Sequence, residues 1–273
     1  MTEDLRNRLL AIKHVALDMD GTIYLSDTLF PFTLPFLDSL KELGIGYSFL
    51  TNNPSKSRRA YLDKLNRMGI PAGPEHMYTT IEATIDYLRY KYPEVRRLFL
   101  LGTPSMISEF EAAGYESVYD NPELVVAAFD MTLTYDRLCK AAWWISKGLP
   151  YIATNPDYVC PTDQPTVLVD CGSICAALER ATGRRPDIVM GKPDPAILYT
   201  IARDHGIHRH ELAMVGDRLY TDIASGLNAG ALSVLVLTGE TTLEDLRGTT
   251  SRLPDLVCRD LSEFLSLLIA ARQ

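Results

Sequence analysis

Val15-Ala16-Leu17 runs directly into Asp18-Met19-Asp20-Gly21-Thr22 near the start of the chain. A short apolar run that stops at a polar turn is typical of a buried parallel strand ending in a loop. Two carboxylates at such a strand end are candidates for chemistry, although Asp18 and Asp20 could also do no more than cap the turn before Gly21.

Strands and helices are predicted to alternate after this stretch. In the outer parts of the chain the predicted helices are Phe36–Leu43, Ser57–Met68 and Ile223–Leu227, and the predicted strands are Tyr47–Leu50, Leu212–Val215 and Leu232–Leu237. Such alternation indicates a parallel sheet with helices on its faces, as in a Rossmann-like α/β fold.

The middle of the chain has an alternation of its own. Its predicted strands are Leu98–Leu101, Val125–Phe129 and Tyr151–Thr154, and its predicted helices are Ser105–Ala113 and Tyr135–Lys147. We therefore expect an α/β domain inserted at residues 82–184 into a core formed by residues 1–81 and 185–273.

Composition excludes several functional classes. The chain has 273 residues, 47% of them hydrophobic, and a formal net charge of -8. An apolar share of this size is ordinary for a globular protein. The acidic balance argues against nucleic acid as a partner, because a polyanion binder should present a basic stripe. The longest apolar runs are too short to cross a bilayer, so no membrane association is expected.

The cysteines favour a reducing compartment. There are five, an odd number without the spacing of a disulfide framework, at Cys139, Cys160, Cys171, Cys175 and Cys258. The N-terminus carries early acidic residues and no signal-peptide core, so we expect a cytoplasmic protein. The sequence leaves the oligomeric state open, including a homo-oligomer.

Polar clusters follow several of the predicted strands. Thr51-Asn52-Asn53 follows one strand, and Gly216-Asp217 followed by Asp222 comes after another. Because ligands bind at the carboxyl ends of parallel strands, these side chains should gather beside Asp18 and Asp20. Carboxylates brought together repel one another, and ligands that offer only oxygen suit Mg²⁺.

Lys192, in Gly191-Lys192-Pro193, adds a positive charge just before a predicted helix. Positioning and positive charge are most of what phosphoryl transfer requires. Plainer interpretations stay open: Lys192 as a surface lysine, Thr51 and Asn52 as turn residues, and Asp222 as a first-turn acid favoured by the helix dipole.

Together, these motifs resemble those of the haloacid dehalogenase (HAD) superfamily in order and spacing. The resemblance rests on Asp18-Met19-Asp20-Gly21-Thr22, Thr51-Asn52-Asn53, Gly191-Lys192-Pro193 and Gly216-Asp217 with Asp222. In the middle of the chain, Thr154-Asn155-Pro156-Asp157 and Cys171-Gly172-Ser173-Ile174-Cys175 are similar to the cap of the NagD-type, class IIA phosphatases.

The resemblance implies a role for each residue. Asp18 would be the nucleophile and Asp20 the general acid and later the base. Magnesium would be held by the Asp18 carboxylate, the Asp20 backbone carbonyl and Asp217, with Asp222 as a direct ligand or as support for a metal-bound water. Thr51, Asn52 and Lys192 would hold the transferring phosphoryl group. The chemistry agrees, because a carboxylate nucleophile splits one hard step into two and a nearby acid protonates the leaving oxygen.

The substrate is expected to be a small phosphorylated metabolite. Where relatives acting on phosphoglycolate or pyridoxal phosphate often carry Pro-Gly-x-Gly, this chain has Val169-Asp170-Cys171-Gly172. That version resembles the NagD branch, which implies a nucleoside monophosphate or a sugar phosphate. The residues expected to set specificity are Asn155, Asp157, Asp170 and Cys171.

Two other functions share the same core residues. A phosphotransferase or mutase would pass the phosphoryl group of Asp18 to an alcohol instead of water. A receiver-like phosphoacceptor module also gathers aspartates, a threonine and a lysine around Mg²⁺. Such a module needs neither an inserted domain nor an acid two residues after the nucleophile, and both are predicted here.

Overall fold

The computed structural model describes residues 2–160, 166–248 and 252–273. The chain folds into two compact units. We call the first the core unit, which comprises Met1–Leu50, Leu62–Met77 and Lys192–Gln273. The second is the inserted unit, which comprises Thr51–Tyr61 and Tyr78–Gly191. The domain limits at residues 82 and 184 stay a prediction, and each unit is described here by itself.

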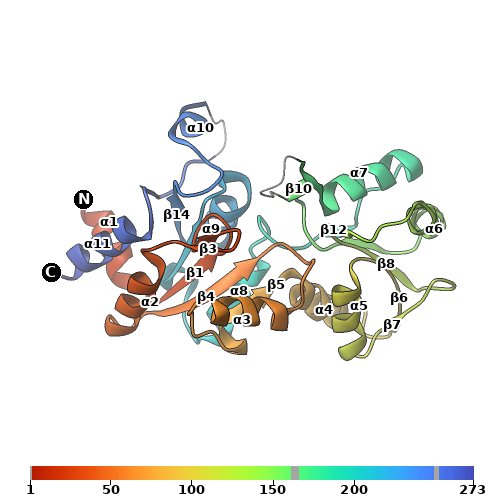
Figure 1. Ribbon diagram of the computed structural model, residues 1–273, viewed down its shortest axis with the longest axis horizontal. Coiled ribbons are helices and arrows are strands. Elements are labelled where there is room, and N and C mark those ends of the chain that lie inside the picture. Colours follow the sequence, from red (N-terminus) through yellow and green to blue (C-terminus); the bar gives the residue numbers. More distant parts are fainter. Residues whose placement is uncertain (1, 161–165, 249–251) are drawn as a thin grey trace. The chain divides into compact units, whose positions relative to one another are not determined.

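A six-stranded sheet in the order β15-β14-β13-β1-β4-β5 forms the centre of the core unit (Figure 1). Neighbouring strands from β15 to β4 run parallel, which confirms the predicted fold class. The strands are β1 (His14–Asp18), β4 (Gly46–Thr51), β5 (Met77–Thr79), β13 (Leu212–Gly216), β14 (Leu232–Val236) and β15 (Leu256–Cys258).

Helices cover this sheet because its central strands are apolar on both faces. All residues of β13 and β14 are buried, as expected for a parallel sheet enclosed by helices. Phe36 and Phe264 pack with ring centroids 6.1 Å apart and join α2 to α11. The helices and short strands are α1 (Glu3–Ala11), β2 (Tyr24–Leu25), β3 (Thr28–Leu29), α2 (Thr33–Glu42), α3 (Arg58–Arg67), η1 (Pro74–His76), α8 (Ala196–Asp204), η2 (Arg209–Glu211), η3 (Leu219–Ile223), α9 (Ala224–Ala229), α10 (Leu243–Gly248) and α11 (Leu261–Arg272).

The inserted unit has its own parallel sheet of five strands in the order β12-β9-β8-β6-β7 (Figure 1). Its elements are α4 (Thr80–Lys91), β6 (Arg97–Leu101), α5 (Pro104–Ala112), β7 (Glu116–Ser117), β8 (Leu124–Ala127), α6 (Tyr135–Ser146), β9 (Tyr151–Ala153), β10 (Val159–Cys160), β11 (Leu168–Val169), α7 (Cys171–Thr182) and β12 (Ile188–Val189).

Alternate residues of this second sheet pack on opposite faces. Leu98 and Leu100 of β6 belong to a cluster with residues of α4 and α5. Phe99 and Leu101 of the same strand belong to a cluster with residues of α6 and α7. This period of two is the geometry of a strand buried on both sides, and it explains why these strands are continuous apolar runs in the sequence.

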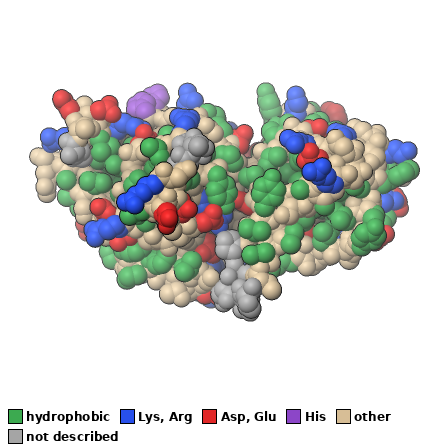
Figure 2. All heavy atoms as spheres, turned by 90° about the horizontal axis from the view of Figure 1, so that it is seen from above, with side chains coloured by type: hydrophobic (Ala, Val, Ile, Leu, Met, Phe, Trp, Pro, Cys, Tyr) green, Lys and Arg blue, Asp and Glu red, His purple; other side chains and the backbone are tan. Residues whose placement is uncertain are grey.

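The surface agrees with the acidic composition. On the face drawn in Figure 2, the lysine and arginine side chains of the described residues are dispersed among acidic and apolar ones and form no continuous stripe. No helix within residues 2–160, 166–248 and 252–273 is both long and apolar enough to span a bilayer.

One histidine at the start of β1 has an unusual environment. His14 is buried, its Nε2 lies 2.8 Å from Ser48 Oγ, and its ring centroid is 4.1 Å from that of His205. Burial first, and then the charges of His205 and His76, lowers the pKa of the His14 imidazole from 6.5 to about 3. The folded protein therefore holds this ring neutral at a pH where the unfolded chain would protonate it.

The stability that neutral His14 contributes should be present above pH 6.5 and should be lost as the pH falls from 6.5 toward 3. Between pH 7.5 and pH 5, we expect the wild type to lose about 1–2 kcal/mol more unfolding free energy than His14→Gln does. Urea melts of both proteins at the two pH values measure this difference. The exposed His210 is the matched control, and His210→Gln should follow the wild type. Equal pH dependence of His14→Gln and the wild type would contradict the assignment.

Candidate active site

The carboxyl ends of two neighbouring strands define the candidate site. β1 ends at Asp18, and β13 ends at Gly216, directly before Asp217. The two strands pair in parallel, with Leu17 opposite Val215, so the residues that follow leave the sheet at the same edge. Asp222 lies in η3, a single π-helical turn. Such turns are rare and occur frequently at functional sites.

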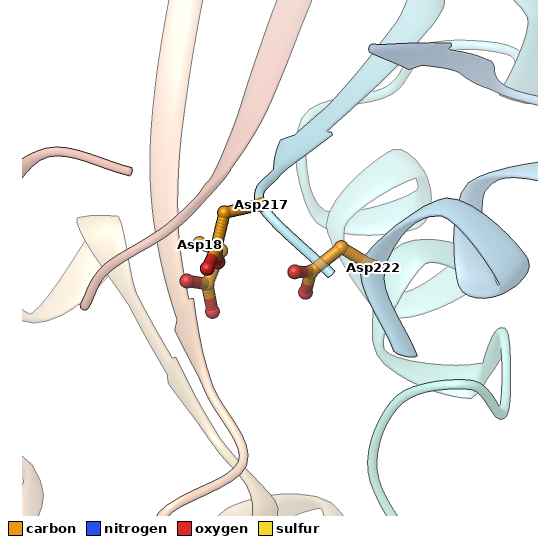
Figure 3. A group of neighbouring side chains, drawn as sticks. All are labelled: Asp18, Asp217 and Asp222. Atoms are coloured by element: carbon orange, nitrogen blue, oxygen red, sulfur yellow. The ribbon is translucent and has the colours of Figure 1, made fainter. Parts of the chain in front are cut away.

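The carboxylates of Asp18, Asp217 and Asp222 converge in the core unit (Figure 3). Each supplies an oxygen, and these three oxygens lie within 4.8 Å of one another. Asp217 and Asp222 are buried, with exposed fractions of 2% and 1%. Three acids this close and this deep require positive charge among them.

Lys192 supplies part of that charge. Its Nζ forms an ion pair with Asp18, and it also lies 2.6 Å from Asp222 Oδ1. The lysine is only 2% exposed, which excludes the interpretation of Lys192 as a surface residue. Burial alone would lower the pKa of Lys192, but Asp18 and Asp222 outweigh it and raise that pKa.

One ammonium group does not neutralise all three acids. Burial raises the pKa of Asp18 to about 6, with Lys192 opposing the rise and Asp222 adding to it. Burial, together with repulsion from Asp18 and Asp222, raises the pKa of Asp217 to about 8. A second positive charge beside these oxygens would therefore be bound favourably.

Asp217 also has the geometry of a cation ligand. Its Oδ2 accepts a hydrogen bond from the backbone N–H of Glu240 at 2.6 Å, whereas its Oδ1 is buried without a hydrogen-bond partner among the described residues. A Cβ at Gly21 would lie 2.6 Å from Asp217 Oδ2, and a Cβ at Gly216 would lie 2.3 Å from Asp222 Cγ. Only glycine leaves room for the carboxylates there, and Gly21 also has a φ of +90°. The oxygen donors and their free lone pairs fit Mg²⁺.

Asp20 lies apart from this cluster of side chains. Its side chain is exposed, and Oδ1 accepts a hydrogen bond from Ser26 N at 3.3 Å. The three-carboxylate cluster consists of Asp18, Asp217 and Asp222, so Asp20 would contribute to a metal through its backbone carbonyl, as the family resemblance implies.

Thr51 and Asn52 begin the inserted unit at the end of β4. Thr51 Oγ1 accepts the N–H of Asn53 at 3.1 Å, and the same hydroxyl can still donate to an anion. The amide of Asn52 donates to Asp157 Oδ2 at 3.0 Å. Sequence reasoning missed this bond because its partners are 105 residues apart and no local pattern links them.

The four residues expected to set specificity form one buried network in the inserted unit. Asn155 Nδ2 donates to Asp157 Oδ2 at 3.2 Å and to Asp170 Oδ1 at 3.0 Å. Asp170 is the N-cap of α7 and accepts the N–H of Cys171. The Cys171 thiol is fully buried and donates to Ala127 O at 3.3 Å, so the Cys171 side chain belongs to the core of this unit.

Sequence reasoning also missed a segment after β14 that contacts Asp217. A Cβ at Gly239 would fall 2.0 Å from Asp217 Oδ2, closer than the Cβ at Gly21 would. The only signal was Thr238-Gly239 at the end of an apolar strand, a pattern that also describes an ordinary turn.

Two family models match the chain. The haloacid dehalogenase-like hydrolase model matches residues 15–116, and a HAD-hydrolase-like model matches residues 189–264. The chain belongs to the haloacid dehalogenase-like hydrolases, and within them to the capped, NagD-type class IIA phosphatases.

Individual relatives are similar over nearly the whole chain. It is 32% identical to the ribonucleotide monophosphatase NagD of Escherichia coli K12, over 87% of this chain and 92% of the relative. It is 33% identical to an acid sugar phosphatase of Staphylococcus aureus, over 94% and 98% of the two chains. The crystal structure of a 4-nitrophenylphosphatase from Thermotoga maritima superposes with a TM-score of 0.91 at 45% identity, covering 95% of this chain and 98% of that one. This protein is therefore a phosphatase.

Proposed function

We propose that the protein is a Mg²⁺-dependent phosphomonoesterase that hydrolyses small phosphate esters through an aspartyl-phosphate on Asp18. The observation that carries the proposal is the cluster of Asp18, Asp217 and Asp222, in which Lys192 forms ion pairs with Asp18 and Asp222. A carboxylate at the end of a strand, with a cation site and a lysine beside it, suits attack on a phosphoryl group.

The chain's own residues would carry out both steps. An Asp18 oxygen attacks phosphorus and the ester P–O bond breaks, while the Asp20 carboxyl gives its proton to the leaving oxygen. A water then attacks phosphorus and gives a proton to Asp20, and the P–O bond to Asp18 breaks to release phosphate and the free carboxylate. The Asp20 side chain is exposed, which is compatible with a role in exchanging protons with water.

Positive charge and hydrogen-bond donors would hold the phosphoryl group during these steps. We assign that role to Lys192, to the Thr51 hydroxyl and to Asn52. Mg²⁺, held by the carboxylates of Asp18 and Asp217 and the Asp20 backbone carbonyl with support from Asp222, would neutralise charge between the attacking carboxylate and the phosphate.

The substrate is proposed to be a nucleoside monophosphate or a sugar phosphate. The names of the relatives support this class, since one is a ribonucleotide monophosphatase and another an acid sugar phosphatase. The buried polar network of Asn155, Asp157 and Asp170 supports it too, because such groups can reject esters that leave them unpaired. A cytoplasmic location stays a prediction, supported by an odd number of cysteines without the spacing of a disulfide framework.

A phosphotransferase or mutase is the second candidate, because water and an alcohol compete for the same aspartyl-phosphate. The family places the chain among phosphatases, which sets the receiver-like module aside. Measuring released phosphate beside phosphate transferred to added alcohols separates hydrolysis from transfer.

Replacing Asp18 tests the nucleophile. Asp18→Asn keeps the size of the side chain and removes the attacking charge, so we expect turnover to fall by roughly a thousandfold or more. Acid quenching during turnover should trap a hydroxylamine-sensitive phosphoenzyme in the wild type and none in the variant. Circular dichroism checks that the variant is folded. Turnover within about tenfold of the wild type would show that the phosphoryl group bypasses Asp18.

Replacing Asp20 tests the acid. Asp20→Asn should slow the hydrolysis of alkyl phosphates more than that of aryl phosphates, because an aryl oxide leaves as a more stable anion and needs less protonation. The rate constants across a leaving-group series measure this difference. Asp27, exposed in the turn between β2 and β3, provides the control variant Asp27→Asn. A uniform loss across the series is the result that removes Asp20 from the role of acid.

Asp170 tests the substrate class. Because its side chain caps α7, Asp170→Ala would also cost about 1 kcal/mol of stability, so Asp170→Asn is the better probe. We expect it to change the relative kcat/KM values among nucleotide and sugar phosphates by about tenfold and to spare 4-nitrophenyl phosphate. Asp136→Asn, an exposed change in the same unit, should alter none of these ratios. If Asp170→Asn scales every ester equally, the network does not select the substrate.

A further inference from the structure

A short segment after β14 encloses the carboxylate of Asp217. The N–H of Glu240 donates to Asp217 Oδ2 at 2.6 Å, and the N–H of Thr241 donates to the Asp217 carbonyl oxygen at 3.2 Å. Thr238 Oγ1 donates to the Gly21 carbonyl oxygen at 2.6 Å. Residues 238–241 are therefore hydrogen-bonded both to Asp217 and to the turn that follows Asp18.

Space, not backbone strain, requires glycine in this segment. A Cβ on Gly239 would fall 2.0 Å from Asp217 Oδ2 and 2.8 Å from Asp217 Cβ. The conformation of Gly239 is not among the left-handed ones of the chain. The absence of a side chain lets the Glu240 N–H reach the carboxylate.

The side chain of Glu240 fixes the segment from the other side. Its Oε2 lies 2.9 Å from Arg218 Nε and accepts the Tyr220 hydroxyl at 3.4 Å. Arg218 and Tyr220 both lie between Asp217 and Asp222 in the chain, and the N–H of Arg218 donates to Asp222 Oδ2 at 3.1 Å. Glu240 thus joins the segment to the stretch that carries both acids.

These contacts act locally on Asp217 and contribute little to the stability of the whole fold. The Glu240 side chain is 45% exposed, and ion pairs with that much solvent contact stabilise a fold only weakly. The hydrogen bond from its N–H, in contrast, reaches a buried carboxylate. That bond occupies Oδ2 and fixes the rotation of the carboxylate, while the buried Oδ1 has no hydrogen-bond partner among the described residues.

We propose that Glu240 is a positioning residue: through its ion pair with Arg218 it holds its own N–H on Asp217 Oδ2, so that Oδ1 is aimed at the cation. The inference rests on the proposed metal site. Groups that hydrogen-bond to a metal ligand directly typically change metal affinity by 10–100-fold when removed. The Glu240 side chain acts on Asp217 only through its own N–H, so we expect a smaller change when that side chain is removed.

Direct metal binding tests the proposal. Calorimetric titration of the metal-free protein with MgCl₂, without substrate, should show Glu240→Ala binding about two- to fivefold more weakly than the wild type, because the variant loses the exposed ion pair and keeps the backbone N–H. Its metal-free melting temperature should stay within about 2 °C of the wild type, and kcat should recover at saturating Mg²⁺. Glu244→Ala removes the same side chain from an exposed position in α10 and should bind Mg²⁺ like the wild type.

Gly239→Ala and Asp217→Asn complete the test. Gly239→Ala should weaken Mg²⁺ binding more than Glu240→Ala, because the added Cβ moves the N–H itself. Unchanged Mg²⁺ affinity in Glu240→Ala, with affinity lost in Asp217→Asn, would overturn the positioning role alone. Unchanged affinity in Asp217→Asn would overturn the proposed metal site as well.

Discussion

The arrangement of the core unit depends on one constraint: three buried acids must be kept together. Asp18, Asp217 and Asp222 come from the ends of two neighbouring strands and one π-helical turn. The ammonium of Lys192 forms ion pairs with Asp18 and Asp222, and the guanidinium of Arg218 also favours the charged forms of the acids. Burial first, and then repulsion among the acids, raises the pKa values of Asp18 and Asp217. A cation beside these oxygens would favour their charged forms, and this is the basis for the proposed metal site.

Backbone geometry, more than side-chain packing, keeps these acids in place. Gly21, Gly216 and Gly239 each occupy a position where a Cβ would collide with Asp217 or Asp222. The carboxylates are consequently held between loops that carry no side chain at the point of contact. Among the described residues, Asp217 Oδ1 is left buried and without a hydrogen-bond partner, which calls for a ligand such as a cation.

The sequence was sufficient for the parts of the molecule that repeat a pattern. The apolar runs Val15-Ala16-Leu17 and Leu212–Val215 lie in β1 and β13, as predicted. Asp18 is the last residue of β1, and Asp217 directly follows β13. Edge strands of two or three residues, such as β12, are too short to show a period, and they were not predicted. The contact of Glu240 with Asp217 uses a backbone N–H, which every residue except proline has, so residue type could not reveal it. The hydrogen bond between Asn52 and Asp157 joins residues that are 105 positions apart, so it depends on the tertiary fold and not on a local sequence pattern.

The order of the strands along the chain also determines when the partners of β1 and Asp18 are synthesised. β1 leaves the ribosome early, but its neighbour β13 begins only at Leu212. Until then one edge of β1 has no strand to pair with, and Asp18 lacks Lys192, which follows it by 174 residues. Most of the inserted unit, from Tyr78 to Gly191, is contiguous and is complete before either partner is synthesised. Every strand of the second sheet is therefore synthesised before the lysine that forms the ion pair with Asp18.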